Sequence, residues 1–230
     1  MGAGRAAKGG GDGVITRLAT GADARVTNPG GRRAVVCVNG GSGREVPGTW
    51  SASLEWLVRR LAPGLPELSF VEVRYRIKSW KRLDWCVDDC RAAISLSAEE
   101  GAEEVALLGF SMGGAVAIAA AGDSHVTTVI GLAPWIPDRL DVSTLDGRRL
   151  AIVHGALDRW LPGIPGVSPK SSLHGFERIR EREIEATHTL VSGGLHGLAV
   201  RGRSGWTIPL PRAGHWARLV AEELRRFQSG

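Results

Sequence analysis

The sequence predicts an α/β protein, a three-layer α/β/α sandwich built on a mostly parallel sheet. Short apolar segments typical of strands alternate with longer segments in which apolar residues recur at helical spacing. The strand segment 33–38 carries the continuous apolar run AVVCV, and segment 105–108 is apolar throughout, as expected where helices cover both faces of a sheet. The chain has 230 residues, 43% of them hydrophobic and 23% charged, which is enough for one large domain with its own core.

The expected strands are short, rich in β-branched residues and bounded by turn residues. Residues 1–13, mostly Gly and Ala without apolar periodicity, are expected to form a disordered N-terminal tail. No linker or repeat follows, so we expect a single domain over residues 14–230. The expected strands are 14–18, 24–27, 33–38, 69–75, 105–108, 126–132, 150–153 and 187–191, the first two at an edge of the sheet.

The expected helices follow most of these strands. In the first helix Leu54, Leu57, Val58 and Leu61 recur at the spacing i, i+3, i+4, i+7, which places them on one face. The expected helices are 54–61, 84–98, 113–121 and 215–227. Strands alternating with helices in this way favour a parallel sheet with helices on both faces.

Charge, cysteine content and hydropathy limit the expected partners. The net charge of +5 comes from dispersed arginine pairs, so we expect no nucleic-acid partner. No apolar run approaches the roughly 18 to 20 residues of a membrane span, so we expect no membrane partner. Three cysteines and an N-terminus without an apolar signal core favour a cytoplasmic protein. Neither a metal ion nor another cofactor is expected.

The segment Gly109-Phe110-Ser111-Met112-Gly113 fits the pattern G-x-S-x-G between a predicted strand and a predicted helix. A serine on such a sharp turn holds strained dihedrals, and small neighbours let the backbone pass without collision. Its hydroxyl is then exposed at the start of a helix, at the carboxyl end of the sheet, where ligands bind in such folds. The alternative interpretation is a simple tight turn. We expect Ser111 to be a nucleophile.

A serine hydroxyl needs an imidazole to take its proton and a carboxylate to orient that imidazole. Asp158 follows the predicted strand 150–153 in a polar loop and is the favoured acid, although it could instead shape an Asx turn. Asp138 is its main competitor. His196 follows the last predicted strand and is the favoured base, whereas His215 at the start of the terminal helix is the alternative.

Two further features belong to the expected site. The backbone N–H of Met112, with that of Gly40 or Gly41 in the glycine-rich loop after residues 33–38, is expected to stabilise a developing oxyanion. Trp135 and Trp160 leave strands on loops that should border the cleft. They could line it for an acyl or aryl group, although packing in the core is an equal alternative.

The elbow GFSMGG, the segment HGALD and the segment SGGLHG, in that order, resemble the α/β-hydrolase superfamily, especially its small lidless dienelactone-hydrolase-like members. The resemblance implies Ser111 as nucleophile, Asp158 as acid and His196 as base. Dienelactone hydrolase itself uses cysteine at the position of Ser111, so its lactone specificity does not carry over. The stretch between residues 132 and 150 is too short for a cap domain, and an open cleft is expected.

The expected function is that of a serine hydrolase with esterase-like chemistry (EC 3.1). It would cleave a small ester, thioester or amide through an acyl-enzyme on Ser111. The same residues could instead support acyl transfer or carbon–carbon hydrolysis, because fold and catalytic residues do not fix the substrate. A hydrolase-like binding module without turnover is the non-enzymatic alternative.

Overall fold

A computed structural model describes residues 13–159 and 166–230. Of the tail expected at residues 1–13, residues 1–12 lie outside the described residues, and so does the predicted cleft residue Trp160. The central sheet has eight strands in the order β1-β2-β5-β3-β7-β8-β9-β10. The first two are antiparallel to their neighbours, and the six from β5 to β10 run parallel. The predicted fold class is therefore confirmed.

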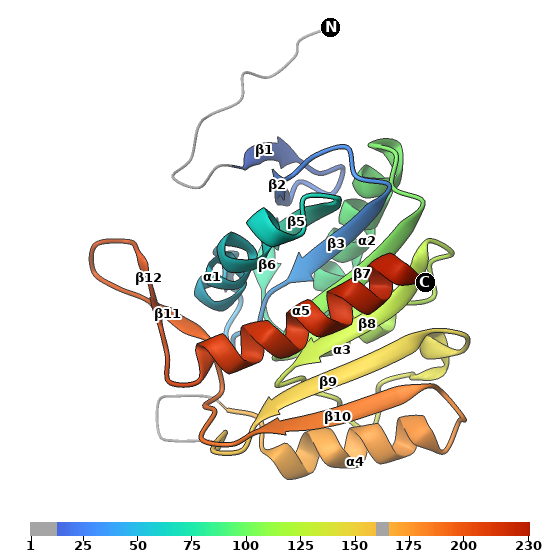
Figure 1. Cartoon of the computed structure of the whole chain (residues 1–230), viewed down its shortest axis with the longest axis vertical. Helices are drawn as coiled ribbons and strands as arrows, with labels where there is room; N and C mark the ends of the chain where they lie inside the picture. Colours follow the sequence, from blue (N-terminus) through green and yellow to red (C-terminus); the bar gives the residue numbers. More distant parts are fainter. Residues whose placement is uncertain (1–12, 160–165) are drawn as a thin grey trace, which may run out of the picture.

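The strands of the sheet match most of the predicted segments to within two residues at each end. Their bounds are β1 (Val14–Arg17), β2 (Asp23–Thr27), β3 (Arg33–Val38), β5 (Leu68–Arg74), β7 (Glu104–Phe110), β8 (Val126–Leu132), β9 (Arg149–Gly155) and β10 (Ala186–Val191). Two small antiparallel pairs lie outside it, β4 (Val46–Pro47) with β6 (Ile77–Lys78) and β11 (Ala199–Arg201) with β12 (Thr207–Pro209). The hairpin β11–β12 projects from the body of the molecule (Figure 1).

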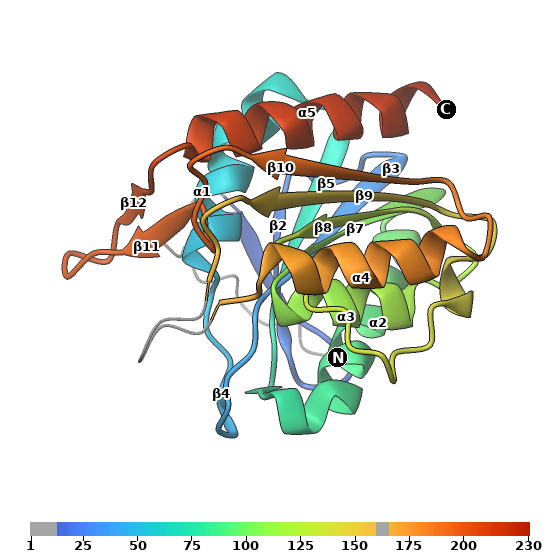
Figure 2. The same ribbon diagram turned by 90° about the horizontal axis from the view of Figure 1, so that it is seen from below.

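Helices cover both faces of the sheet. They are α1 (Ala52–Leu61), α2 (Leu83–Glu99), α3 (Met112–Ala120), α4 (Pro169–Arg180) and α5 (Ala213–Ser229), with short 3-10 turns η1 (Ala62–Gly64), η2 (Trp80–Arg82) and η3 (Ser143–Leu145). Helices α1 and α5 lie on one face, and α2, α3 and α4 lie on the other (Figures 1 and 2). Only η3 separates β8 from β9, and the described residues include no cap domain.

Burial explains why strand β3 is apolar at every position after Arg33. Ala34, Val36 and Val38 belong to the core beneath α2 and α3, whereas Val35 and Cys37 belong to the core beneath α1 and α5. Successive side chains of a strand point to opposite faces, so a strand buried on both faces has no polar alternation. Burial on both faces fixes β3 in the centre of the sheet.

The expectation that residues 24–27 form an edge strand is wrong. Strand β2 pairs with β1 on one side and with β5 on the other, and it buries Ala24 and Val26. Between them lies Arg25, whose side chain is buried in an ion pair with Glu72 of β5. The charge of Arg25 is thus paired inside the sheet, which allows β2 to lie between two neighbouring strands.

The parallel register brings the carboxyl ends of the inner strands to one edge. Val38 pairs with Gly109, the next-to-last residue of β7, and Gly155 at the end of β9 pairs with Val191 at the end of β10. The loops that follow these strands therefore begin side by side. Within the described residues, no helix is both long and apolar enough to span a membrane.

Candidate functional site

Ser111 occupies a sharp turn between β7 and α3. Its backbone has φ 56° and ψ −118°, an unusual conformation for a residue with a side chain. A Cβ on Gly109 would lie 2.2 Å from the carbonyl oxygen of Gly113, and a Cβ on Gly113 would lie 2.2 Å from that of Val38. Both positions of the G-x-S-x-G pattern thus require glycine for steric reasons. The turn leaves Ser111 9% exposed at the start of α3.

The structure brings Ser111, His196 and Asp158 into one hydrogen-bonded chain. His196 Nε2 lies 3.0 Å from Ser111 Oγ, and His196 Nδ1 lies 2.7 Å from Asp158 Oδ2. Because Nδ1 faces a carboxylate, it carries the ring proton, and Nε2 is left to accept from the serine hydroxyl. These residues come from the loops after β7, β9 and β10. Such an arrangement can transfer the serine proton to the imidazole.

Asp158 is 3% exposed and lies in the interior. Burial by itself raises the pKa of Asp158, but hydrogen bonds from His154 and His196 outweigh it and hold the pKa below its ordinary value of 3.8. Asp158 is therefore a carboxylate at neutral pH and can stabilise a positive charge on His196. Its other oxygen, Oδ1, is buried without a hydrogen-bond partner among the residues that the structure describes.

The competing acid and base lie elsewhere. The Asp138 side chain is 81% exposed and lies 3.1 Å from His174 on α4. His215 is near the start of α5, and within the described residues it forms no hydrogen bond with Ser111. Sequence spacing alone left both alternatives open.

The glycine-rich loop after β3 lies against Ser111. A Cβ on Gly40 would be 3.3 Å from Ser111 Cβ, an unusually close approach. The Gly40 N–H donates to Asn39 Oδ1 at 2.7 Å. The Gly41 N–H has no acceptor among the described residues, so Gly41 is the available donor of the two predicted glycines. The Met112 N–H lies at the start of α3, directly after Ser111. Gly41 and Met112 are in contact, because a Cβ on Gly41 would lie 2.3 Å from Met112 Sδ.

Trp135 borders the same region, and it has an aromatic partner that the sequence analysis did not include. Its backbone N–H donates to the Ser111 carbonyl at 2.9 Å. Its ring stacks on Trp80 of η2, with 6.3 Å between ring centroids, and Trp80 contacts Gly41. Trp80 is 40% exposed. The sequence could have indicated Trp80, because it lies shortly after the predicted strand 69–75, in a loop at the same edge of the sheet.

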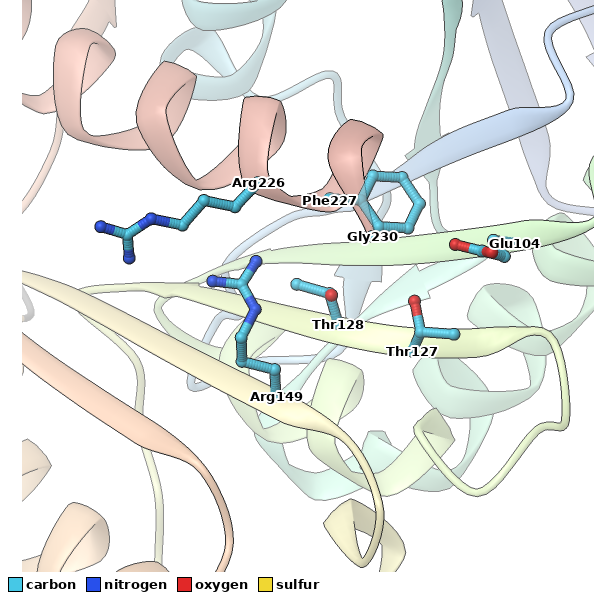
Figure 3. Close-up of a pocket in the computed structure, with 7 residues that line it drawn as sticks. All are labelled: Glu104, Thr127, Thr128, Arg149, Arg226, Phe227 and Gly230. Atoms are coloured by element: carbon cyan, nitrogen blue, oxygen red, sulfur yellow. The ribbon is translucent and has the colours of Figure 1, made fainter.

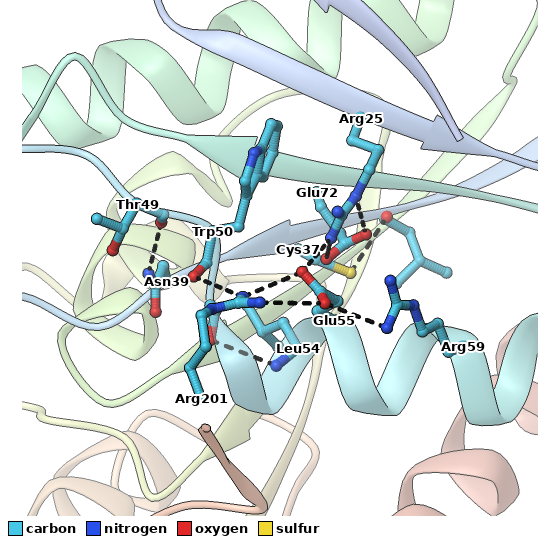
Figure 4. Close-up of polar contacts among 12 residues, drawn as sticks. Arg25, Cys37, Asn39, Thr49, Trp50, Leu54, Glu55, Arg59, Glu72 and Arg201 are labelled. Carbon is cyan, nitrogen blue, oxygen red and sulfur yellow. Dashed lines mark hydrogen bonds and ion pairs between the residues drawn. The ribbon is translucent and has the colours of Figure 1, made fainter. Parts of the chain in front are cut away.

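A buried ionic network supports the segment that follows His196 (Figure 4). Arg25 contacts Glu72 at 2.7 Å and Glu55 of α1 at 3.1 Å, and Glu55 also contacts Arg201 of β11 at 3.1 Å. Burial raises the pKa of Glu72, although its hydrogen bond with Arg25 opposes that rise. The hairpin that begins shortly after His196 is thus tied to α1 and, through Arg25, to the sheet.

A separate hollow lies at the opposite edge of the sheet, where β7, β8 and β9 begin (Figure 3). Its two cationic side chains, Arg149 and Arg226, both pair with Glu223 of α5, so neither is free for an anion. The lining residues are Glu104, Thr127, Thr128, Arg149, Arg226, Phe227 and Gly230. Among the described residues, no cluster of three or more His, Cys, Asp or Glu side chains could hold a metal ion.

No family model matches the chain, and no curated protein matches it in sequence. Solved structures do match. A putative α/β hydrolase of unknown function from Agrobacterium tumefaciens has a TM-score of 0.70 and 15% identity, over 95% of this chain and 97% of that chain. A serine hydrolase without a lid from Xanthomonas campestris has a TM-score of 0.57 and 19% identity, over 80% and 84%. A butyrate-bound esterase from Thermogutta terrifontis has a TM-score of 0.63 and 16% identity, over 93% and 92%. The predicted α/β-hydrolase fold is confirmed.

Proposed function

We propose that this protein is a serine hydrolase that cleaves a small ester through an acyl-enzyme on Ser111. The observation that carries the proposal is the unbroken chain of hydrogen bonds from Asp158 through His196 to Ser111 Oγ. A strained serine, an imidazole and a buried carboxylate in this order form the arrangement that makes an alcohol nucleophilic.

The reaction takes place in two halves. His196 Nε2 removes the proton of the Ser111 hydroxyl as Oγ attacks the substrate carbonyl carbon, and Asp158 stabilises the resulting imidazolium. The imidazolium then gives that proton to the leaving alcohol, and the carbonyl re-forms as an acyl-enzyme. Water attacks this ester in the second half, His196 takes its proton, and Ser111 leaves with a proton while the carboxylic acid is released.

Negative charge develops on the carbonyl oxygen in both halves. The N–H groups of Met112 and Gly41 are the proposed donors, because both adjoin Ser111 and neither has a recorded acceptor within the described chain. The Gly40 N–H is left out of this role because Asn39 Oδ1 occupies it. Asn39 then acts by shaping the loop.

The proposed substrate is a small carboxylic ester whose apolar group contacts Trp135 and Trp80. The stacked rings lie beside Gly41 and the Ser111 backbone, next to the proposed oxyanion donors. Esterases among the structurally similar proteins support ester chemistry. The absence of a cap domain from the described residues supports an open cleft, suited to a small soluble substrate.

The test is active-site labelling with a fluorophosphonate probe, together with hydrolysis of p-nitrophenyl butyrate. Wild type should be labelled and should turn over the ester, and Ser111→Ala should lose both, with kcat reduced by a factor on the order of 10⁶. Ser204→Ala is the matched control, because Ser204 is an exposed serine in the turn between β11 and β12. Equal labelling of wild type and Ser111→Ala would show that Ser111 is not the nucleophile.

A further inference from the structure

A second histidine, His154, contacts the carboxylate of Asp158. We propose that His154 is a positioning residue that holds Asp158 Oδ2 in place. Because His196 contacts the same oxygen, the two histidines share the negative charge of Asp158. His154 Nε2 lies 3.0 Å from Asp158 Oδ2, the same oxygen that His196 Nδ1 contacts at 2.7 Å. This inference rests on the proposed function, since it concerns how the acid of that site is held.

The surroundings of His154 determine where its proton lies. Nε2 lies within hydrogen-bond distance of two acceptors, Asp158 Oδ2 and the Val167 carbonyl oxygen at 2.9 Å. Neither acceptor can donate, so Nε2 carries the hydrogen and shares it between them. Nδ1 is buried and has no partner in the described part of the chain. The ring is thus a neutral Nε2–H tautomer that donates to the catalytic carboxylate.

His154 is well placed to hold the acid rigidly. It lies in β9, which ends at Gly155, and its side chain is fully buried. The ring contacts the loop near its start, at Asp158, and near its end, at Val167. Because a β-strand is more rigid than a loop, a donor on β9 fixes Asp158 Oδ2 even when His196 moves to deliver a proton.

The second donor should also affect the basicity of His196. Each hydrogen bond to Oδ2 withdraws negative charge from it, so His154 weakens the attraction between Asp158 and an imidazolium at His196. Without His154 the carboxylate would favour the protonated form of His196 more strongly. The acid limb of the pH profile would then move to higher pH, because more of the base would be protonated.

The groups that face His154 come from three elements. Asp158 lies on its own loop, His196 follows β10, and His188 lies within β10 with 6.5 Å between the two ring centroids. His188 Nε2 lies 3.0 Å from Ser172 Oγ of α4. Burial lowers the pKa of His188, which keeps it neutral at pH 7. His188 has no recorded contact with Asp158 among the described residues and is therefore a matched control.

The experiment compares His154→Phe, His154→Gln and the control His188→Phe. The kcat/KM for p-nitrophenyl butyrate is measured from pH 5 to pH 9, beside thermal unfolding. His154→Phe should lower kcat/KM roughly tenfold and move the acid midpoint up by about half a pH unit. His154→Gln should keep kcat/KM and the acid midpoint close to the wild-type values, because the glutamine amide N–H can donate to Asp158 Oδ2. His188→Phe should leave the midpoint unchanged.

The inference is overturned if folded His154→Phe keeps the wild-type midpoint, or if His188→Phe moves it equally. Should His154→Phe fail to fold, ¹⁵N NMR of the wild-type imidazoles supplies the test. His154 should show a protonated Nε2 and a bare Nδ1, and the opposite tautomer would refute the proposal. Fluorophosphonate labelling separates the two failures: an unlabelled wild type rejects the proposed function, whereas a labelled wild type with an unmoved midpoint rejects only the role of His154.

Discussion

The replacement Gly41→Ala tests the proposed oxyanion donor directly. A Cβ at this position would lie 2.3 Å from Met112 Sδ and 2.3 Å from Trp80 Cδ1. Gly41 does not have a positive φ, so alanine meets no backbone strain there. The effect of the substitution is therefore a steric one, at the contacts of the loop with Met112 of α3 and with Trp80 of η2.

The size of the effect follows from these distances. To reach the 3.4 Å of an ordinary van der Waals contact, Gly41 and its two neighbours must separate by about 1 Å. Displacement of a reacting or stabilising group by about 1 Å can cost about 100-fold in rate. Complete loss of one oxyanion donor costs about 10²–10³ in kcat. We expect kcat for p-nitrophenyl butyrate to fall between about tenfold and 100-fold, because the Met112 side chain can absorb part of the shift.

Gly43→Ala is the control, because a Cβ on Gly43 meets nothing within 4 Å although it lies in the same loop. It should retain kcat within about twofold of wild type. Fluorophosphonate labelling of Gly41→Ala should continue at a reduced rate, since Ser111 and His196 are unchanged. If Gly41→Ala keeps wild-type kcat, or if Gly43→Ala loses as much, the Gly41 N–H is not the donor.

Three more outcomes are expected. Arg25→Met should lower the free energy of unfolding in urea by about 3–5 kcal/mol at pH 7, because the buried Glu72 carboxylate loses its partner. Since burial raises the pKa of Glu72 above its ordinary value of 4.5, the loss should shrink as the pH falls toward 4.5, and a pH-independent loss would contradict the explanation. Asp158→Asn should reduce kcat about 10⁴-fold. Because the pKa of Asp158 is lowered, its charge stabilises the fold above pH 3.8. The difference in unfolding free energy between wild type and Asp158→Asn should therefore diminish as the pH falls below 3.8, and an undiminished difference would contradict a stabilising charge on Asp158. Trp135→Ala removes the stacking partner of Trp80 and should raise KM for aryl esters by roughly threefold to tenfold, and KM for acetyl esters by less. An equal rise in KM for both kinds of ester would exclude a contact between the aryl group and these rings.

The sequence by itself determined the features that arise from local sterics and periodicity. Gly109 and Gly113 flank Ser111 because any Cβ there would collide with backbone, so the turn is visible in five consecutive letters. Strand β3 is apolar at every position after Arg33 because both of its faces are buried, and this pattern predicted a central parallel strand. Such features need no knowledge of distant residues.

Only the tertiary structure decided which distant side chains meet. Asp138 and Asp158 both follow strands in polar loops, and His196 and His215 both satisfy the chain order, so the sequence favoured one member of each pair without excluding the other. The register of β9 and β10 brings Asp158 and His196 together, and it also places His154 on the same carboxylate. Hydrogen bonds form over about 3 Å, whereas sequence patterns report only which face or which end of a strand a residue occupies.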